Sequence, residues 1–344
     1  MIKNNKVAKS PVELTKDDFL SDQMVKWCPG CGAHAILAAV GNVFPKIGYR
    51  KENFTMISGI GCSSRFPYYV DTFGFHGIHG RAAAIASGVK IANPGLSVWV
   101  ATGDGDSMAI GGNHFIHVLR RNIDINILLF NNRIYGLTKG QYSPTTPLGA
   151  KTKTSPDGTI EHPFTVSGLV MGAQGTFYAR VPDNDVKLMT EVLYEAANHD
   201  GTSVIEILQN CVIFADKVHD MVTNKKTRHD RQLFLKHGEP MIFGENREKG
   251  IVLNGTQLEV VEIGKNGITE DDILVHDQYA KNPSIQRMVG WMKAPDFPVA
   301  MGVIRAAPAD TYDELLLNQI NTARETSDIQ SVNDLLRSGQ TWEI

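Results

Sequence analysis

The sequence lacks a long hydrophobic run, a strong charge of one sign and more than a few cysteines. No apolar segment approaches the roughly 18 residues that span a bilayer, and the opening stretch MIKNNKVAKSPVELTKDDFLSD has no apolar signal-peptide core. A net charge of −3 argues against general binding to nucleic acid or to anionic membranes. We therefore expect a cytoplasmic protein that binds neither nucleic acid nor membrane.

Four cysteines in 344 residues are too few to suggest a disulfide framework, because cytoplasmic thiols stay reduced. Cys28 and Cys31 flank Pro and Gly in WCPGCGAHAIL (27–37), just before an apolar helical pattern. Cys62 lies in SGIGCSSRFPYYV and Cys211 follows SVIEILQN. The Cys-x-x-Cys pair alone leaves three interpretations open: a metal site, a redox disulfide or simple packing.

Short β-branched and apolar runs alternate with helical patterns. The runs that predict strands are FTMIS (54–58), SVWVAT (97–102), INILLF (125–130), TFYAR (176–180) and SVIEIL (203–208). The helical patterns lie near 33–44, 80–92, 110–121, 164–173 and 184–198. This alternation predicts an α/β fold with a doubly wound, mostly parallel sheet, in which the continuous apolar runs are central strands.

The regular alternation of apolar runs and helical patterns ends at about residue 215. We expect residues 1–215 to form the core domain and 216–344 a C-terminal extension that packs on the core or on a partner subunit. The extension should contain a short hairpin and a helix with Thr311 as its N-cap. Residues 139–163, rich in Pro, Gly, Ser and Thr, form a loop too long for an ordinary connection. The basic stretch KKTRHDR (225–231) is interpreted as a solvated loop.

Two polar motifs stand at predicted strand ends. In VATGDGDSMAIGG a strand passes through Gly103-Asp104-Gly105 into a helix, which suits a phosphate bound at a helix N-terminus. A second strand ends in FNNRIYG, with Asn132 at the turn. Because ligands bind at the carboxyl ends of parallel strands, Asp104 and Asn132 can meet there around Mg²⁺ between carboxylate and phosphate. Taken singly, each motif is no more than a turn.

The remaining cysteines also stand at strand ends, so all four thiolates can converge on one edge of the sheet. Such a set could hold a [4Fe–4S] cluster or a tetrahedral zinc ion. A thioredoxin-like redox pair would have no need of Cys62 and Cys211, and buried inert thiols are the remaining alternative, above all for Cys211.

The spacing of GDG and NN resembles the thiamine-diphosphate signature. Together with CPGCGAH, GIGCSSR, HGIHGRAAAIASGVK and NNRIYGLTKGQYSPTT, it makes residues 20–215 resemble the β subunit of 2-oxoacid:ferredoxin oxidoreductases. The resemblance implies a [4Fe–4S] cluster on Cys28, Cys31, Cys62 and Cys211. It implies Mg²⁺ on Asp104, Asn132 and the carbonyl of Ile134. The residues implied near thiamine diphosphate are Ile60, Gly61, Cys62, His79, Gly80, Arg81, Gly103, Gly105, Asp106, Tyr135, Gly136, Leu137 and Thr138.

Two cations are candidates for binding an acidic substrate, Arg65 in CSSRFPYY and Lys139 in GLTKGQYSPTT. The alternatives are that Arg65 pairs with an Asp of the protein and that Lys139 is a solvated loop charge. The C-terminal segment LVHDQYAKNPSIQRMVGWMKAPDFPVAMGVIRA resembles the 2-oxoglutarate branch of the family rather than the pyruvate branch.

The resemblance implies oxidation of 2-oxoglutarate with coenzyme A to succinyl-CoA and CO₂, with electrons passed through the cluster to ferredoxin, reversibly in principle. No proton-relay Glu for the cofactor is evident here, so the α subunit should supply it and no catalytic residue is assigned on this chain. The alternatives are a pyruvate or broad 2-oxoacid enzyme, a non-oxidative thiamine-dependent decarboxylase and a zinc-stapled assembly subunit.

Overall fold

The main sheet has eight strands in a computed structural model that describes residues 7–340 and 342. The strand order is β2-β1-β3-β4-β6-β5-β11-β7, parallel throughout except where β11 runs antiparallel to β5. Its strands are β1 (Phe54–Ser58), β2 (Phe73–His76), β3 (Ser97–Gly103), β4 (Asn126–Asn131), β5 (Phe177–Pro182), β6 (Ser203–Leu208), β7 (Gln232–Phe234) and β11 (Val299–Ala306). This confirms the expected mostly parallel α/β sheet.

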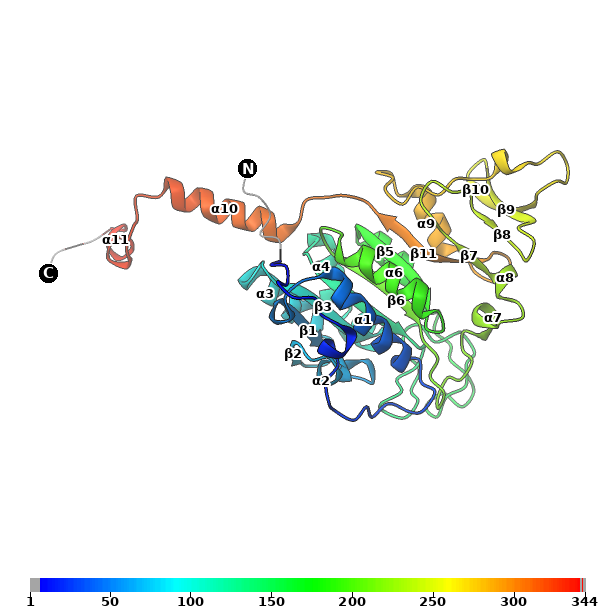
Figure 1. Cartoon of the computed structure of the whole chain (residues 1–344), viewed down its shortest axis with the longest axis horizontal. Helices are drawn as coiled ribbons and strands as arrows, with labels where there is room; N and C mark the ends of the chain where they lie inside the picture. Colours follow the sequence, from blue (N-terminus) through cyan, green and yellow to red (C-terminus); the bar gives the residue numbers. More distant parts are fainter. Residues whose placement is uncertain (1–6, 341, 343–344) are drawn as a thin grey trace.

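Helices connect the strands and cover both faces of the sheet (Figure 1). The longer ones are α1 (Ala33–Ile47), α3 (Ala82–Ala92), α4 (Gly112–Arg121), α5 (Val166–Gly172), α6 (Val186–Ala197) and α9 (Ser284–Trp291). The short ones are α2 (Phe66–Tyr69), α7 (Asp220–Thr223) and α8 (Arg228–Arg231), with a π-helical turn at Asp106–Ile110 and 3₁₀ turns at Lys16–Phe19, Lys51–Asn53, Ser63–Arg65 and Glu270–Asp272.

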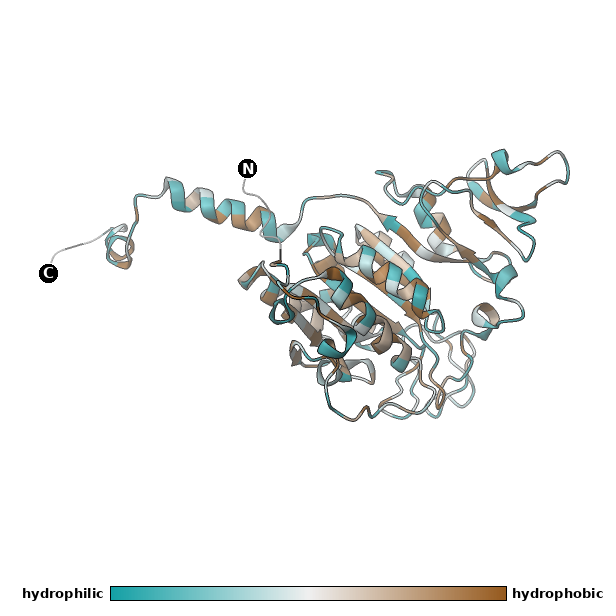
Figure 2. Ribbon diagram, viewed as in Figure 1, coloured by the Kyte–Doolittle hydropathy of each residue, from teal (hydrophilic) through white to brown (hydrophobic). Residues whose placement is uncertain are grey.

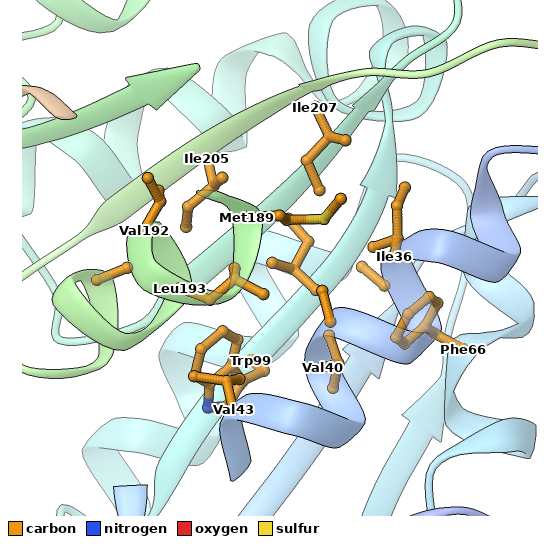
Figure 3. Close-up of a cluster of buried hydrophobic side chains, with 14 of the residues drawn as sticks. Ile36, Val40, Val43, Phe66, Trp99, Met189, Val192, Leu193, Ile205 and Ile207 are labelled. Carbon is orange, nitrogen blue, oxygen red and sulfur yellow. The ribbon is translucent and has the colours of Figure 1, made fainter. Parts of the chain in front are cut away.

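Alternation along each strand divides the core into two layers. Trp99 of β3 faces α1 and α6, where it lies among Val40, Val43 and Leu193 (Figure 3). Its neighbours Val98 and Val100 face the layer of α3, α4 and α5. Every residue of β4, β5 and β6 is buried, which explains why these strands read as continuous runs rather than as alternating patterns.

The chain after residue 215 adds strands to the main sheet and also forms a second, smaller sheet. Strands β7 and β11 extend the sheet, whereas β8 (Ile242–Phe243), β9 (Lys249–Asn254) and β10 (Gln257–Glu262) form a small antiparallel sheet that contains the expected hairpin. Helices α10 (Tyr312–Thr326) and α11 (Val332–Arg337) project from the body, and hydrophobic and hydrophilic residues alternate along α10 (Figure 2). Thr311 is the N-cap of α10, as predicted.

None of the helices in residues 7–340 combines the length and the apolar character that a bilayer crossing demands.

Candidate functional site

The candidate site lies at the carboxyl edge of β1, β3, β4 and β6, which are neighbours in the sheet. Gly103 of β3 is in register with Phe130 of β4, so Asp104 and Asn131, the next residues on each strand, emerge side by side. Cys62 follows β1 and Cys211 follows β6 at the same edge. The topology therefore brings together the two groups of residues that the sequence placed at strand ends.

Asp104 is almost wholly buried, and hydroxyl groups surround its carboxylate. Ser143 Oγ and Thr145 Oγ1 each donate to Asp104 Oδ2 over 2.5 Å, and Thr145 Oγ1 also lies 3.0 Å from Asn131 Oδ1. Burial raises the pKa of Asp104 in spite of these hydrogen bonds. Among the described residues no salt bridge reaches this carboxylate, although its charge raises the pKa of the buried Arg133 against the larger, opposing effect of burial. A buried carboxylate without an ion-pair partner fits a divalent metal ion.

The two asparagines of FNNRIYG have different roles. Asn131 Nδ2 donates to Glu206 Oε1 over 2.7 Å, which ties the end of β4 to β6. Asn132 Nδ2 donates to Gln209 Oε1 over 3.2 Å, while its Oδ1 accepts from the backbone N–H of Ile134 over 3.2 Å. Asn132 therefore shapes the turn that carries Ile134, and its side-chain oxygen points toward the backbone of that turn.

Residue 105 must be a glycine, because the ring of Tyr135 lies very close to its backbone. Tyr135 Oη donates to the Gly105 carbonyl over 3.1 Å, and a Cβ at Gly105 would lie only 2.2 Å from Tyr135 Cε1. No side chain larger than hydrogen is compatible with that contact. The GDG turn after β3 and the turn after β4 are thus locked together face to face.

Asp106 joins the segments that the resemblance placed around the cofactor. Its carboxylate accepts from the backbone N–H of Ile60 (3.1 Å) and Gly80 (2.7 Å), from His79 Nδ1 (2.5 Å) and from Thr102 Oγ1 (2.8 Å). Its oxygens are therefore used by protein donors. Asp106 lies within the predicted set and holds the loop after β1 and the turn before α3 against each other.

The other predicted cofactor residues surround these anchors. Arg81 lies at the N-terminus of α3 and donates to the carbonyl of Ile110 over 3.3 Å. Gly61 has φ +118°, a conformation that suits glycine. Gly136, Leu137 and Thr138 follow Tyr135 in a turn closed by the Gly140 N–H donating to the Tyr135 carbonyl over 2.9 Å.

The four cysteines come together from three segments and all carry free thiols. A Cβ at Gly136 would lie 3.7 Å from the Sγ atoms of both Cys62 and Cys211. Cys31 Sγ lies 3.5 Å from Gln209 Nε2, two residues from Cys211. Burial first, and then the neighbouring thiols of the other three cysteines, raises the pKa of Cys62 to about 11.

Two hydrogen bonds to backbone carbonyls hold the cysteine segments in place. Trp27 Nε1 donates to the Cys62 carbonyl over 2.7 Å, and the Gly32 N–H donates to the Asn210 carbonyl over 3.3 Å. Each bond joins the Cys28–Cys31 turn to one of the strand-end cysteines. The gathering of thiols is therefore built into the fold.

The spacing of the thiols bears on what they can hold. Among residues 7–340 and 342, no set of three or more His, Cys, Asp and Glu side chains lies close enough to hold a single metal ion. A tetrahedral zinc site needs such a set. A [4Fe–4S] cluster binds each thiolate to a different iron, so its four ligands stand farther apart.

The two candidate substrate cations lie beside these groups. Arg65 ends the 3₁₀ turn that begins at Ser63, immediately after Cys62, and it is partly buried. Lys139 is exposed and has φ +75°, which is uncommon for a residue with a side chain. In the part of the chain that the structure describes, neither side chain forms a salt bridge.

The sequence did not predict the residues that hold this edge of the sheet in place through hydrogen bonds and an ion pair. Glu206 of β6 is buried with Arg180 of β5, whose Nε lies 2.7 Å from Glu206 Oε2, and Tyr178 Oη donates to the same oxygen. Ser143 and Thr145 of the long loop were missed as well. A Glu inside the apolar run SVIEIL was the one local signal for this network.

Comparisons with known proteins agree with this geometry. The family described as "Thiamine pyrophosphate enzyme, C-terminal TPP binding domain" matches residues 59–207, which contain the Asp104 edge. The 2-oxoglutarate oxidoreductase subunit KorB of Mycobacterium tuberculosis is 47% identical over 330 residues, 95% of this chain and 88% of that protein. The 2-oxoglutarate synthase subunit KorB of Archaeoglobus fulgidus is 44% identical over 196 residues, 56% of this chain and 73% of that protein.

A solved structure extends the likeness to the whole fold. It is the 2-oxoglutarate:ferredoxin oxidoreductase from Magnetococcus marinus with 2-oxoglutarate, coenzyme A and succinyl-CoA bound. The match has a TM-score of 0.78 at 28% identity and covers 97% of this chain and 99% of that one. A relative this similar along nearly its entire length, and a sheet edge arranged for a diphosphate cofactor, lead to one conclusion: the chain belongs to the 2-oxoacid:ferredoxin oxidoreductase family, as a thiamine-diphosphate-binding β subunit.

Proposed function

We propose that this chain is the β subunit of a cytoplasmic 2-oxoglutarate:ferredoxin oxidoreductase. With an α subunit it would convert 2-oxoglutarate, coenzyme A and oxidised ferredoxin to succinyl-CoA, CO₂ and reduced ferredoxin, and the reverse reaction is open in principle. The names and bound ligands of the relatives support the substrate. The observation that carries the proposal is the gathering of four thiols at the edge that holds Asp104.

The Asp104 edge would hold Mg²⁺ and the diphosphate group. Asp104 and Asn132 side chains and the Ile134 carbonyl would bind the metal, and the GDG turn would carry the diphosphate. Thiamine diphosphate, when bound, supplies the carbon nucleophile and the electron sink that decarboxylation of a 2-oxoacid requires. The chain contributes a buried carboxylate whose charge a metal ion would neutralise, and Ser143 and Thr145 exclude water from its other side.

The cysteines would hold a [4Fe–4S] cluster, which supplies a one-electron carrier. Gly136 lies in the turn that leads from Tyr135 and is in contact range of Cys62 and Cys211. The turn that leads from Tyr135 therefore packs directly against these two thiols. A cluster on these thiols would therefore lie within a few residues of the turn that we assign to the cofactor.

Arg65 and Lys139 would provide positive charge for the substrate. A dicarboxylate brings a second negative charge, and its burial needs a cationic partner. Lys139 directly follows Thr138 and Arg65 lies three residues after Cys62, and neither forms an intrachain salt bridge within the described residues. They are the first positions at which we expect substitutions to separate 2-oxoglutarate from pyruvate.

Anaerobic purification of the chain with its α subunit tests the proposal. We expect a brown protein with an absorption band near about 400 nm, about four irons per β chain and thiamine released on denaturation. We also expect dye reduction that depends on coenzyme A and is faster with 2-oxoglutarate than with pyruvate. A colourless protein with one zinc per chain would overturn the oxidoreductase. CO₂ release without dye reduction would indicate a non-oxidative decarboxylase, and pyruvate as the faster substrate would overturn the substrate assignment.

A further inference from the structure

The Cys28–Cys31 turn is where the cysteine cluster comes closest to solvent. Cys28 is exposed, as are Pro29 and Gly30, whereas the other three cysteines are partly buried. Because electron tunnelling weakens steeply with distance, an electron leaves most readily where the thiols meet the surface. The exit point therefore lies at this turn rather than on the long loop or on the helices.

A groove of about 900 Å³ runs beside this turn. Pro29, Gly30 and Cys31 line one side, and three exposed lysines line the other, namely Lys217, Lys225 and Lys226. We name these three lysines together with the Cys28–Cys31 turn the exit surface. In the part of the chain that the structure describes, none of the three lysines forms a salt bridge.

Two carboxylates also line the groove, and each accepts a hydrogen bond from a nearby amide group. Asp183 is buried and accepts from the Asn210 N–H over 2.7 Å, and Asp220 Oδ2 accepts from Asn224 Nδ2 over 3.0 Å. The lysine ammonium groups have no such partners. The three lysines are exposed, whereas Asp183 is buried and Asp220 is partly buried, so the charge that the groove presents to solvent is mainly positive on a chain whose net charge is −3.

Exposed apolar side chains lie in the same segments. Met24 is 74% exposed four residues before Cys28, Ile213 is 59% exposed two residues after Cys211, and Met221 is 59% exposed beside Asp220. Apolar groups with a charged rim are typical of interfaces between proteins that bind transiently. Methionine suits such a surface because its flexible side chain adapts to different partners.

We propose that the exit surface docks a small acidic protein that carries one electron. The inference rests on the proposed function, because it assumes a redox centre on the four cysteines. In each encounter the centre is oxidised by one electron, the carrier is reduced by one, and no covalent bond changes. The lysines would steer the acidic partner and orient it over the Cys28–Cys31 turn, which raises the association rate and makes it depend on salt.

The test uses the complete α–β complex and a strongly acidic bacterial ferredoxin as the probe. The variant is Lys225→Glu/Lys226→Glu. The matched control is Lys46→Glu/Lys281→Glu, which changes the net charge equally at two exposed lysines outside the groove. Affinity is measured by calorimetry with both proteins oxidised, so the readout does not depend on turnover. We expect the first variant to weaken binding about tenfold at low salt and the control to stay within about twofold of the parent.

The salt dependence provides a second readout. The parent complex should lose affinity steeply as salt rises, and Lys225→Glu/Lys226→Glu should flatten that dependence. Equal effects of the two variants, or the absence of saturable binding to the parent complex, would overturn the exit surface. Reduction of a small viologen dye, which needs no docking, should be the same in all three proteins. Loss of dye reduction in the parent would instead count against the proposed function.

Discussion

Two buried carboxylates, Asp104 and Glu206, lie on either side of β4 and are compensated in opposite ways. Asn131 connects them, since its Nδ2 donates to Glu206 over 2.7 Å and its Oδ1 shares the single hydroxyl hydrogen of Thr145 with Asp104. Glu206 has Arg180 at 2.7 Å, whereas the donors to Asp104 are hydroxyl groups and backbone N–H groups and include no salt-bridge partner among the described residues. Burial is the largest influence on both and raises both pKa values, but for Glu206 it is outweighed by Arg180 together with the hydrogen bonds of Tyr178 and Asn131. The pKa of Glu206 is therefore lowered, while that of Asp104 is raised.

The contrast separates a structural charge from a functional one. Glu206 and Arg180 satisfy each other inside the fold, so the pair is complete without any ligand. Asp104 has no such ion pair among the described residues, although its charge acts on Arg133, and keeping it buried costs free energy. A carboxylate retained under that penalty, at the end of a parallel strand, points to a bound cation as its partner.

Removal of Arg180 should have the largest effect on stability. Arg180→Met leaves Glu206 buried without its cation and should lower the free energy of unfolding by about 3–5 kcal/mol, measured by urea denaturation. The double variant Arg180→Met/Glu206→Gln should recover much of that loss, because the unpaired charge is gone. A loss below about 1 kcal/mol for the single variant would mean that Arg180 does not stabilise buried Glu206, and the contrast with Asp104 would fail.

Removal of Asp104 should abolish stabilisation by the cofactor. With Mg²⁺ and thiamine diphosphate at about a hundred times their dissociation constants, the parent protein should gain about 2.7 kcal/mol, and Asp104→Asn should gain almost none. Asp313→Asn is the matched control, since Asp313 is also buried with a raised pKa but accepts from the Asp124 N–H instead. Equal gains in both variants would remove Asp104 from the metal site.

Loss of the shared hydroxyl should have a smaller effect. Thr145→Val keeps the shape but removes the donor to Asp104 and Asn131, and should cost about 1–2 kcal/mol in urea denaturation. Thr152→Val in the same long loop, where Thr152 is only partly buried and its hydroxyl contacts Thr154, should change stability by less than about 0.5 kcal/mol. If the two substitutions cost the same, Thr145 does not support the Asp104 edge.

The pH dependence of the metal-free protein should show the smallest effect. The folded-state pKa of Asp104 is raised above 3.8, so its contribution to stability is complete below pH 3.8 and is lost as pH rises through the folded-state pKa. Stability relative to Asp104→Asn should therefore fall by up to about 1.4 kcal/mol per pH unit in that interval. Glu206 has a lowered pKa, so its contribution is lost instead as pH falls below 4.5. A difference that increases with pH would contradict the assignment for Asp104.

Much of the fold could be predicted because its signals are local. The five predicted strands end within two residues of the observed ones, since buried central strands are continuous apolar runs bounded by turns. Strand β2 was missed because FGFH is short and exposed at the edge of the sheet. Strands β7 and β11 were missed because their pairing joins residues far apart in the chain, with β11 running against β5.

The candidate site was predictable in part for the same reason. GDGD, NN and the cysteines are visible at strand ends, and parallel strands bring their carboxyl ends to one edge. Ser143 and Thr145 reach Asp104 across 39 and 41 positions of an irregular loop, and Glu206 reaches Asn131 across 75. No periodicity encodes such contacts, because a loop has no repeating geometry.

The sequence by itself determined the fold class, the edge at which polar residues gather and the number of thiols available. The tertiary structure decided which of those residues are satisfied by the protein and which are left for a ligand. Asp106 is satisfied by donors and Glu206 by donors and a cation, whereas Asp104 has donors but no ion-pair partner among the described residues. That distinction depends on burial and on partners distant in the chain, and the free energy of a buried charge is set by the groups that surround it in space.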